Sequence, residues 1–269
     1  MIKDFVGVNG ATLYYEKQGI GASVLFIAGL TGDAGNFTRT ADLLANEFTV
    51  VTYDRRGNSR SPRPSGWTTT SVDEQADDAA GLIQALELSP AMVFGASAGG
   101  PIALDLITRH SPLVRGGILQ EPSVFSLLPD PEAALAPRRA LVEEALRTDG
   151  PEEAIKAVMR YLNDDAVFAA IPPDVLERML GNAETILTVE SPGFTHWKPK
   201  PDDLAKLSVP IALMYASDTL PAYKELTCLL AKHLKIQTTT VPGRHGFYYY
   251  RPQDLADALR PILKRFAKN

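Results

Sequence analysis

Short apolar runs rich in β-branched and aromatic residues alternate with longer segments of helical periodicity through most of this chain. Six such runs, at residues 23–27, 48–53, 91–94, 117–120, 210–215 and 236–241, predict buried strands. Helices are predicted between or after them at residues 36–46, 71–86, 100–110, 223–233 and 252–268. This alternation is typical of an α/β fold, in which a parallel sheet carries helices on both faces. The near-continuous hydrophobicity of the runs suits strands that are covered on both sides.

The first two strands are predicted to run antiparallel to each other. Residues 5–8 and 12–15 form two short strand-like segments that meet at Asn9-Gly10. This dipeptide favours the tight turn of a β-hairpin. Together with the six later runs, the hairpin gives a mostly parallel eight-stranded sheet.

The region at residues 122–203 interrupts the alternation. It contains helical runs at residues 131–147, 151–163 and 173–190, it contains no convincing strand, and prolines mark its joints. Because it is connected to the sheet at both ends, we expect a helical lid over the carboxyl edge of the sheet. Residues 1–121 and 204–269 then form the core; a separate helical domain is the alternative.

Composition limits the partners. The 269 residues carry a net charge of −5, which gives no electrostatic reason to bind nucleic acid or an anionic membrane. The single cysteine, Cys228, cannot form an internal disulfide or a metal cage, and no metal or organic cofactor is expected. There is neither an apolar stretch of 18 residues nor a signal-peptide-like start, so a cytoplasmic location is expected.

The sequence Gly95-Ala96-Ser97-Ala98-Gly99 lies between a predicted strand and a predicted helix. In this context a G-x-S-x-G pattern predicts a nucleophile elbow, a strained turn that lifts the serine hydroxyl above the sheet edge. The flanking positions must be glycine because a Cβ there would collide with a neighbouring helix or strand. Ser97 is therefore the candidate nucleophile. A phosphate-binding turn is the alternative, although a P-loop lysine and a G-x-G-x-x-G pattern are both missing.

A serine nucleophile needs a base, and His245 is the best placed of four histidines. It follows the last predicted strand, at the sheet edge where ligands bind in such folds. His110 is expected to cap a helix, His233 lies between lysines on a predicted surface helix, and His196 lies in the lid.

Two carboxylates are candidates for the acid that orients the imidazole. Glu121 follows the predicted strand 117–120, and Asp218 follows the predicted strand 210–215. Both stand between Ser97 and His245 in chain order, as an elbow of this type requires. Each also has a structural interpretation, because Glu121 could bind lid amides and Asp218 could cap a helix. The residues themselves do not separate the two.

The oxyanion of an acyl-transfer reaction needs two N–H donors. The N–H of Ala98 lies at a helix N-terminus, and Gly29 lets the chain bend so that the N–H of Leu30 points inward. The predicted lid supplies apolar side chains that either line a substrate pocket or form the lid's own core; the substrate-binding candidates are Gly29, Phe125, Leu128, Met159 and Trp197.

These motifs together resemble those of the α/β-hydrolase superfamily over essentially the whole chain. Within it, the sequence resembles largely actinobacterial members of unassigned substrate. The resemblance depends on the segments at residues 28–33 and 53–61, on Gln120-Glu121-Pro122 and on residues 127–130. In relatives with the Glu-Pro motif the glutamate serves as triad acid, as in zearalenone-type lactonases and some haloalkane dehalogenases, which favours Glu121 over Asp218. Ala28 departs from the family pattern, where histidine often precedes the glycine.

The resemblance implies a serine hydrolase that cleaves a small hydrophobic carboxylic ester or lactone. Perhydrolases of the haloperoxidase type and cofactor-free dioxygenases resemble the same fold and use the same serine and histidine, so peroxide or oxygen chemistry is an alternative. A small-molecule receptor with a vestigial triad is another. A homodimer is compatible with the sequence, which does not determine the oligomeric state.

Overall fold

The computed structural model describes residues 1–200, 204 and 207–268. Its strands form one eight-stranded sheet in the order β1-β2-β4-β3-β5-β6-β7-β8. β1 pairs antiparallel with β2, and β2 pairs antiparallel with β4, whereas β3 to β8 run parallel. The predicted mostly parallel sheet is confirmed. The strands are β1 (Ile2–Val8), β2 (Ala11–Gln18), β3 (Ser23–Ile27), β4 (Thr49–Tyr53), β5 (Ala91–Ala96), β6 (Val114–Gln120), β7 (Ile211–Ala216) and β8 (Thr238–Val241).

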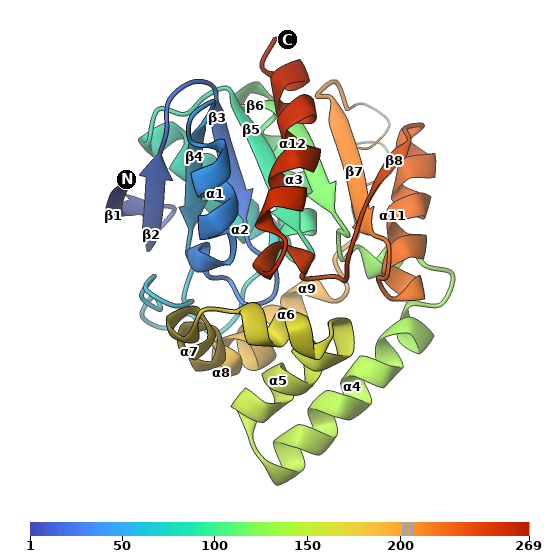
Figure 1. The fold of residues 1–269 in the computed structure, drawn as a ribbon. Coiled ribbons are helices and arrows are strands. Elements are labelled where there is room, and N and C mark those ends of the chain that lie inside the picture. Colours follow the sequence, from blue (N-terminus) through green and yellow to red (C-terminus); the bar gives the residue numbers. More distant parts are fainter. Residues whose placement is uncertain (201–203, 205–206, 269) are drawn as a thin grey trace.

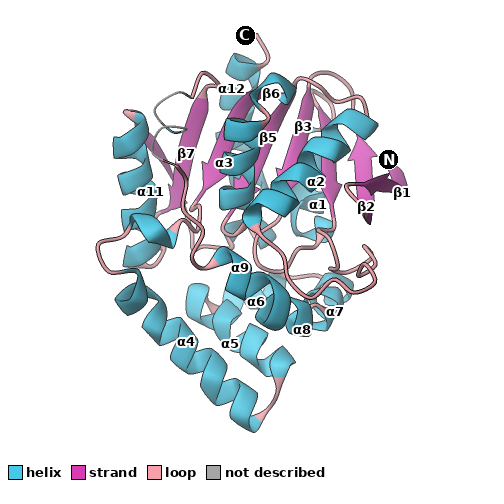
Figure 2. Ribbon diagram, turned by 180° about the vertical axis from the view of Figure 1, so that it is seen from behind, coloured by secondary structure: helices cyan, strands magenta, loops and turns pink. Residues whose placement is uncertain are grey.

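Helices cover both faces of the sheet, as the sequence predicts. α1 (Thr38–Leu44) and α12 (Pro252–Phe266) lie on one face, and α2 (Val72–Ala85), α3 (Gly99–Arg109) and α11 (Pro221–Leu234) lie on the other (Figures 1 and 2). Alternate residues of each strand therefore enter different cores. In β3, Val24 and Phe26 pack on the α1/α12 side, whereas Leu25 and Ile27 pack on the α2/α3 side. All four side chains are fully buried, which explains why the strand is apolar throughout.

A layer of helices lies beyond one end of the sheet (Figure 1). It comes entirely from the segment between β6 and β7, where the sequence predicts a lid. The last part of the predicted boundary, residues 201–203, falls outside the described residues. We refer to this layer as the lid; its elements are α4 (Pro131–Thr148), α5 (Pro151–Leu162), α6 (Asp165–Ala170), α7 (Pro173–Gly181), α8 (Ala183–Thr185), a π-helical turn (Ile186–Glu190) and α9 (Ser191–Phe194).

The helix predicted over residues 173–190 is interrupted at Asn182. The side chain of this residue is buried and binds the core instead of facing solvent. Its amide donates to the Thr31 carbonyl at 2.7 Å and accepts the Ser59 N–H at 2.6 Å. These bonds tie the chain at Asn182 to two core turns, and the segment continues as α8.

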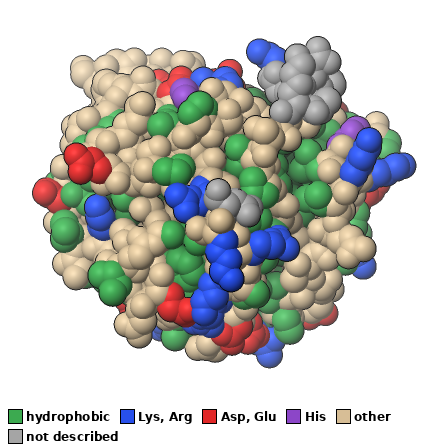
Figure 3. Space-filling model, turned by 90° about the horizontal axis from the view of Figure 1, so that it is seen from above, with side chains coloured by type: hydrophobic (Ala, Val, Ile, Leu, Met, Phe, Trp, Pro, Cys, Tyr) green, Lys and Arg blue, Asp and Glu red, His purple; other side chains and the backbone are tan. Residues whose placement is uncertain are grey.

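The end of the molecule opposite the lid is shown in Figure 3. Acidic, basic and hydrophobic side chains are interspersed on this face. None of the helices in the described part of the chain combines the length and the apolar character that a bilayer crossing requires.

Candidate active site

Ser97 occupies the sharp turn between β5 and α3. Its φ of +52° lies in the left-handed region, which side chains rarely adopt, so the turn is strained. The Ser97 N–H donates to the Gln120 carbonyl at 2.9 Å, which fixes the turn against the end of β6. The flanking glycines are needed for close packing. A Cβ on Gly95 would lie 2.5 Å from the Gly99 carbonyl oxygen, and a Cβ on Gly99 would lie 2.3 Å from the Ile27 carbonyl oxygen.

We expect Gly99→Ala to lower the free energy of unfolding by about 1–3 kcal/mol, the usual cost of overpacking a tight site. The atoms in the way are backbone oxygens of β3 and the turn after it, which cannot move without disturbing the centre of the sheet. Urea unfolding would measure the effect. Gly181→Ala is the matched control, since Gly181 ends α7 with nothing within 4 Å of its added Cβ. Equal urea midpoints for Gly99→Ala and the wild type would contradict the close packing.

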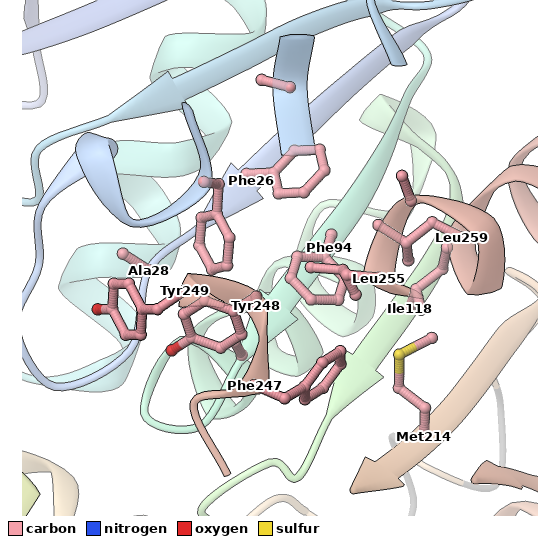
Figure 4. Close-up of a cluster of buried hydrophobic side chains, with 14 of the residues drawn as sticks. Phe26, Ala28, Phe94, Ile118, Met214, Phe247, Tyr248, Tyr249, Leu255 and Leu259 are labelled. Carbon is pink, nitrogen blue, oxygen red and sulfur yellow. The ribbon is translucent and has the colours of Figure 1, made fainter. Parts of the chain in front are cut away.

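His245 lies in the loop after β8, and its position is fixed by a hydrogen bond to its carbonyl and by the buried residues that follow it. The Gln120 side-chain amide donates to the His245 carbonyl at 3.2 Å. After it, Phe247 and Tyr248 turn into the core that covers one face of the sheet (Figure 4). The rings of Tyr248 and Phe37 have centroids 5.0 Å apart. Because these large side chains are buried, the position of the imidazole is set by the core rather than by a free loop.

The Glu121 carboxylate is fully buried and contacts the imidazole of His245, with Oε2 against Nδ1. Oε1 accepts the Ala216 N–H at 2.7 Å, and Oε2 also accepts the Thr219 hydroxyl at 2.7 Å. Burial by itself would raise the pKa of Glu121, but the charge of His245 and these hydrogen bonds outweigh it and hold the pKa below its ordinary value. An ionised carboxylate can only accept, so Nδ1 carries the proton and Nε2 is left as the acceptor.

Asp218 does not contact the imidazole in this structure. Its side chain is exposed and accepts the Ser217 hydroxyl at 3.1 Å, while its N–H donates to the Gly243 carbonyl at 2.9 Å. Of the two carboxylates that the sequence leaves open, the structure brings Glu121 to His245.

Ser97 and His245 line the same hollow, which Met159 also lines. Ser97 also lines a second hollow, and the two hollows share Leu30 and Leu162. The Ser97 hydroxyl lies 3.3 Å from the Ser123 hydroxyl in the second hollow. The candidate nucleophile therefore stands where two hollows meet.

The proposed oxyanion donors lie beside this serine. Leu30 and Ala98 line the second hollow together with Ser97. Within the described residues, neither the Leu30 N–H nor the Ala98 N–H has a hydrogen-bond acceptor. Gly29 lets the turn approach the elbow, since a Cβ there would be 3.1 Å from the Ser97 Cβ. Two N–H groups without acceptors at such a place can receive a developing negative charge.

The lid is connected to the turn after β3, at Gly29 and Leu30, by Arg55, which is fully buried. Its guanidinium makes a two-pronged ion pair with Glu190 of the π-helical turn, at 2.6 and 2.8 Å. The same guanidinium donates to the carbonyl oxygens of Gly29 and Leu30, at 3.0 and 3.3 Å. The sequence marks this arginine only as part of a turn motif; its link to the lid depends on contacts 135 residues apart.

The other substrate-binding candidates divide into two groups. Phe125 lines the second hollow and Met159 the first. Leu128 is buried in a cluster between the lid and α11 and lines neither hollow. Trp197 lies away from both, and its indole N–H donates to Asp73 at 3.1 Å.

Sequence reasoning did not single out several residues that line the second hollow. Nothing in their local patterns marks them, because α4, α9 and the start of α11 are brought together only by tertiary packing. They are Ser123, Arg138, Glu190, Ser191, Phe194, Thr195 and Tyr223.

The remaining histidines lie elsewhere. His110 is the C-cap of α3, as expected: its backbone N–H donates to the Leu106 carbonyl at 2.9 Å. Its side chain bonds through Nε2 to the Asp77 carboxylate at 2.7 Å, and His196 and His233 are exposed. Across the part of the chain that the structure describes, no group of three or more His, Cys, Asp or Glu side chains is placed to hold a metal ion.

Comparison with known proteins gives consistent results. The family model described as alpha/beta hydrolase fold matches residues 22–149. The chain is 32% identical over 269 residues to the uncharacterized hydrolase YraK of Bacillus subtilis (strain 168), an alignment that covers 97% of this chain and 96% of that protein.

Solved structures extend the likeness to the whole chain. A thermophilic esterase from Thermogutta terrifontis matches with a TM-score of 0.80 and 22% identity, covering 99% of this chain and all of that one. An enol-lactonase from Burkholderia xenovorans LB400 matches with a TM-score of 0.76 and 18% identity, covering 97% of this chain and all of that one. At these identities the likeness concerns the fold.

Proposed function

The chain belongs to the α/β-hydrolase superfamily, and from that premise we propose that it is a serine hydrolase of small carboxylic esters or lactones with Ser97 as nucleophile. The observation that carries the proposal is the buried contact between Glu121 and His245, because His245 lines the same hollow as Ser97. Nucleophile, base and orienting acid are thereby supplied by three neighbouring parts of one sheet edge.

In the proposed reaction the Ser97 oxygen attacks the substrate carbonyl carbon, and Nε2 of His245 takes the hydroxyl proton. Glu121 stays ionised, accepts a hydrogen bond from the Nδ1–H of His245 and stabilises the imidazolium that forms. The N–H groups of Leu30 and Ala98 bind the oxyanion of the tetrahedral intermediate, and removing one such donor typically costs about 10²–10³-fold in kcat. His245 then protonates the leaving alkoxide. A water molecule, deprotonated by His245, releases the acid from Ser97 by the same steps.

A fluorophosphonate probe tests the assignment of the nucleophile. We expect one probe per chain on the peptide that contains Ser97, with hydrolysis of p-nitrophenyl butyrate falling in proportion to labelling. Peptide mass spectrometry locates the label, and absorbance at the nitrophenolate band follows hydrolysis. Ser123→Ala is the matched control, because the Ser123 hydroxyl lies 3.3 Å from that of Ser97. It should keep the label, whereas a label on Ser123, or full activity in labelled protein, would rule the proposal out.

A further inference from the structure

We propose that the substrate carries an anionic group, a carboxylate a few carbons from the reactive carbonyl, and that Arg138 of the lid binds this group. The inference rests on the proposed function and specifies its substrate class. Two of the residues that line the second hollow beside Ser97 carry charged side chains, Arg138 and Glu190.

The charge of Glu190 is already compensated. Its two oxygens are bound by Arg55, and Oε1 also accepts from the Gln75 side chain at 3.1 Å and the Asn58 side chain at 2.8 Å. The negative charge that borders the hollow is therefore neutralised within the protein.

Arg138 is different. It is half-buried in the wall of the hollow, and no carboxylate among the described residues lies within ion-pair distance of it. Its neighbour Arg139 has such a partner, Glu132, at 2.6 Å. A guanidinium without a counter-ion at the wall of a hollow is available to bind an anionic group. The net charge of the hollow is thus positive.

The guanidinium of Arg138 lies over the ring of Phe125, 5.5 Å from its centroid. Stacking on an aromatic face leaves the N–H edge of a guanidinium available, and that edge matches the two oxygens of a carboxylate. The ring of Phe125 packs edge-on against that of Tyr223, with centroids 5.6 Å apart, and the ring of Tyr223 packs on the imidazole of His245, with centroids 4.6 Å apart. One aromatic row therefore connects the free cation to the candidate base.

Neutral hydroxyls surround the same space. Burial raises the pKa of Tyr223, an effect that the positive charge of Arg138 partly opposes, so the phenol is protonated at neutral pH. Ser123, Ser191 and Thr195 also line the hollow. These groups can donate hydrogen bonds to an anion that Arg138 holds.

Arg138 also stands at the junction with an adjoining hollow, which shares Leu30, Ser191 and Thr195 with the second hollow. The remaining lining next to Ser97 is mainly apolar. A ligand that spans this space needs an apolar middle, with a carbonyl at Ser97 and an anion at Arg138. Half-esters of short dicarboxylic acids and lactones that carry a carboxylate have this form.

The test compares mono-p-nitrophenyl glutarate with p-nitrophenyl valerate, two esters of similar length of which the first is anionic. We expect the wild type to favour the anionic ester in kcat/KM by about ten- to hundredfold, the range that a charge-assisted hydrogen bond provides. In Arg138→Gln this ratio should fall to near one, mainly through a higher KM for the anionic ester. Arg147→Gln, which removes the same charge from an exposed position of α4, should keep the ratio.

Binding supplies a readout that does not need turnover. In a Ser97→Ala background, calorimetry should show that monomethyl glutarate binds at least tenfold more weakly once Arg138 is also replaced by glutamine. Equal kcat/KM for the two esters in the wild type, or an unchanged ratio in Arg138→Gln, would overturn the inference while leaving the ester hydrolase intact. If the wild type hydrolyses neither ester and takes no phosphonate label, both the proposed function and the inference are wrong.

Discussion

Replacing Ser97 with alanine is expected to lower kcat for ester hydrolysis by about 10⁴–10⁶-fold, because losing the nucleophile of a serine hydrolase removes nearly all of its rate enhancement. The remaining rate would come from the oxyanion donors and from substrate binding. Alanine fits the turn without new contacts, and Ser97 is 93% buried in a hollow rather than in the close-packed core. Initial-rate kinetics with p-nitrophenyl butyrate would measure the decrease in kcat.

The same variant should keep the fold of the wild type, because the positive φ of this turn disfavours serine and alanine alike. Circular dichroism and the urea midpoint are the controls. A rate within tenfold of the wild type, in a folded protein, would show that another residue attacks the substrate.

Replacing Glu121 with glutamine is expected to lower kcat by about 10⁴-fold, the effect seen when the orienting carboxylate of such a site becomes an amide. Glutamine has nearly the same shape and can still accept the Ala216 N–H. An amide, however, can present its NH₂ to Nδ1 of His245 and stabilise the tautomer whose Nε2 carries the proton, which cannot act as a base. The loss should fall in kcat rather than in KM.

Asp218→Asn is the matched control for this variant. Asp218 is exposed and contacts Ser217, so we expect kcat within about twofold of the wild type, as for most surface changes. A larger fall for Asp218→Asn than for Glu121→Gln would assign the acid to the other loop.

The loss of folding stability at acid pH gives a second measurement of the role of Glu121. Its folded-state pKa is held below the ordinary 4.5, so the ionised contact adds stability that is present above 4.5 and is lost as the pH falls through the lowered value. Urea midpoints between about pH 3 and 6 should therefore decline less steeply in Glu121→Gln than in the wild type. Parallel curves would indicate that the carboxylate does not contribute in this way.

The overall architecture could be predicted from local pattern because the central strands β3 to β7 are buried on both faces and are apolar for most of their length. The positions of Ser97 and His245 followed from the same logic, since both come directly after parallel strands. The carboxylate that contacts His245 could not be chosen in this way. β7 lies between β6 and β8 in the sheet, so Glu121 must reach past the end of β7, where it binds Ala216 and Thr219 on the way.

The lid was predictable only in outline. Helical periodicity identifies its segments, but the side of each helix that faces the hollow depends on how the helices pack on one another. Leu128 and Trp197 have the apolar character expected of residues that bind a hydrophobic substrate, but they lie outside both hollows beside Ser97. Arg138, one of two consecutive arginines in the sequence, lines the second hollow. The break at Asn182 likewise depends on partners more than 120 residues away.

Because of the buried ion pair of Arg55 with Glu190, two parts of the lid, the π-helical turn and α4, differ in how well they tolerate substitution. Breaking one partner of such a pair typically costs about 3–5 kcal/mol, and here it would also release the carbonyls of the turn at Gly29. α4, by contrast, buries a single residue, Leu135. We therefore expect substitutions that change the size or the charge of the second hollow to be tolerated far better on α4 than on the π-helical turn. Changes intended to alter which acids or alcohols the hollow accepts should begin with α4, the helix that carries Arg138.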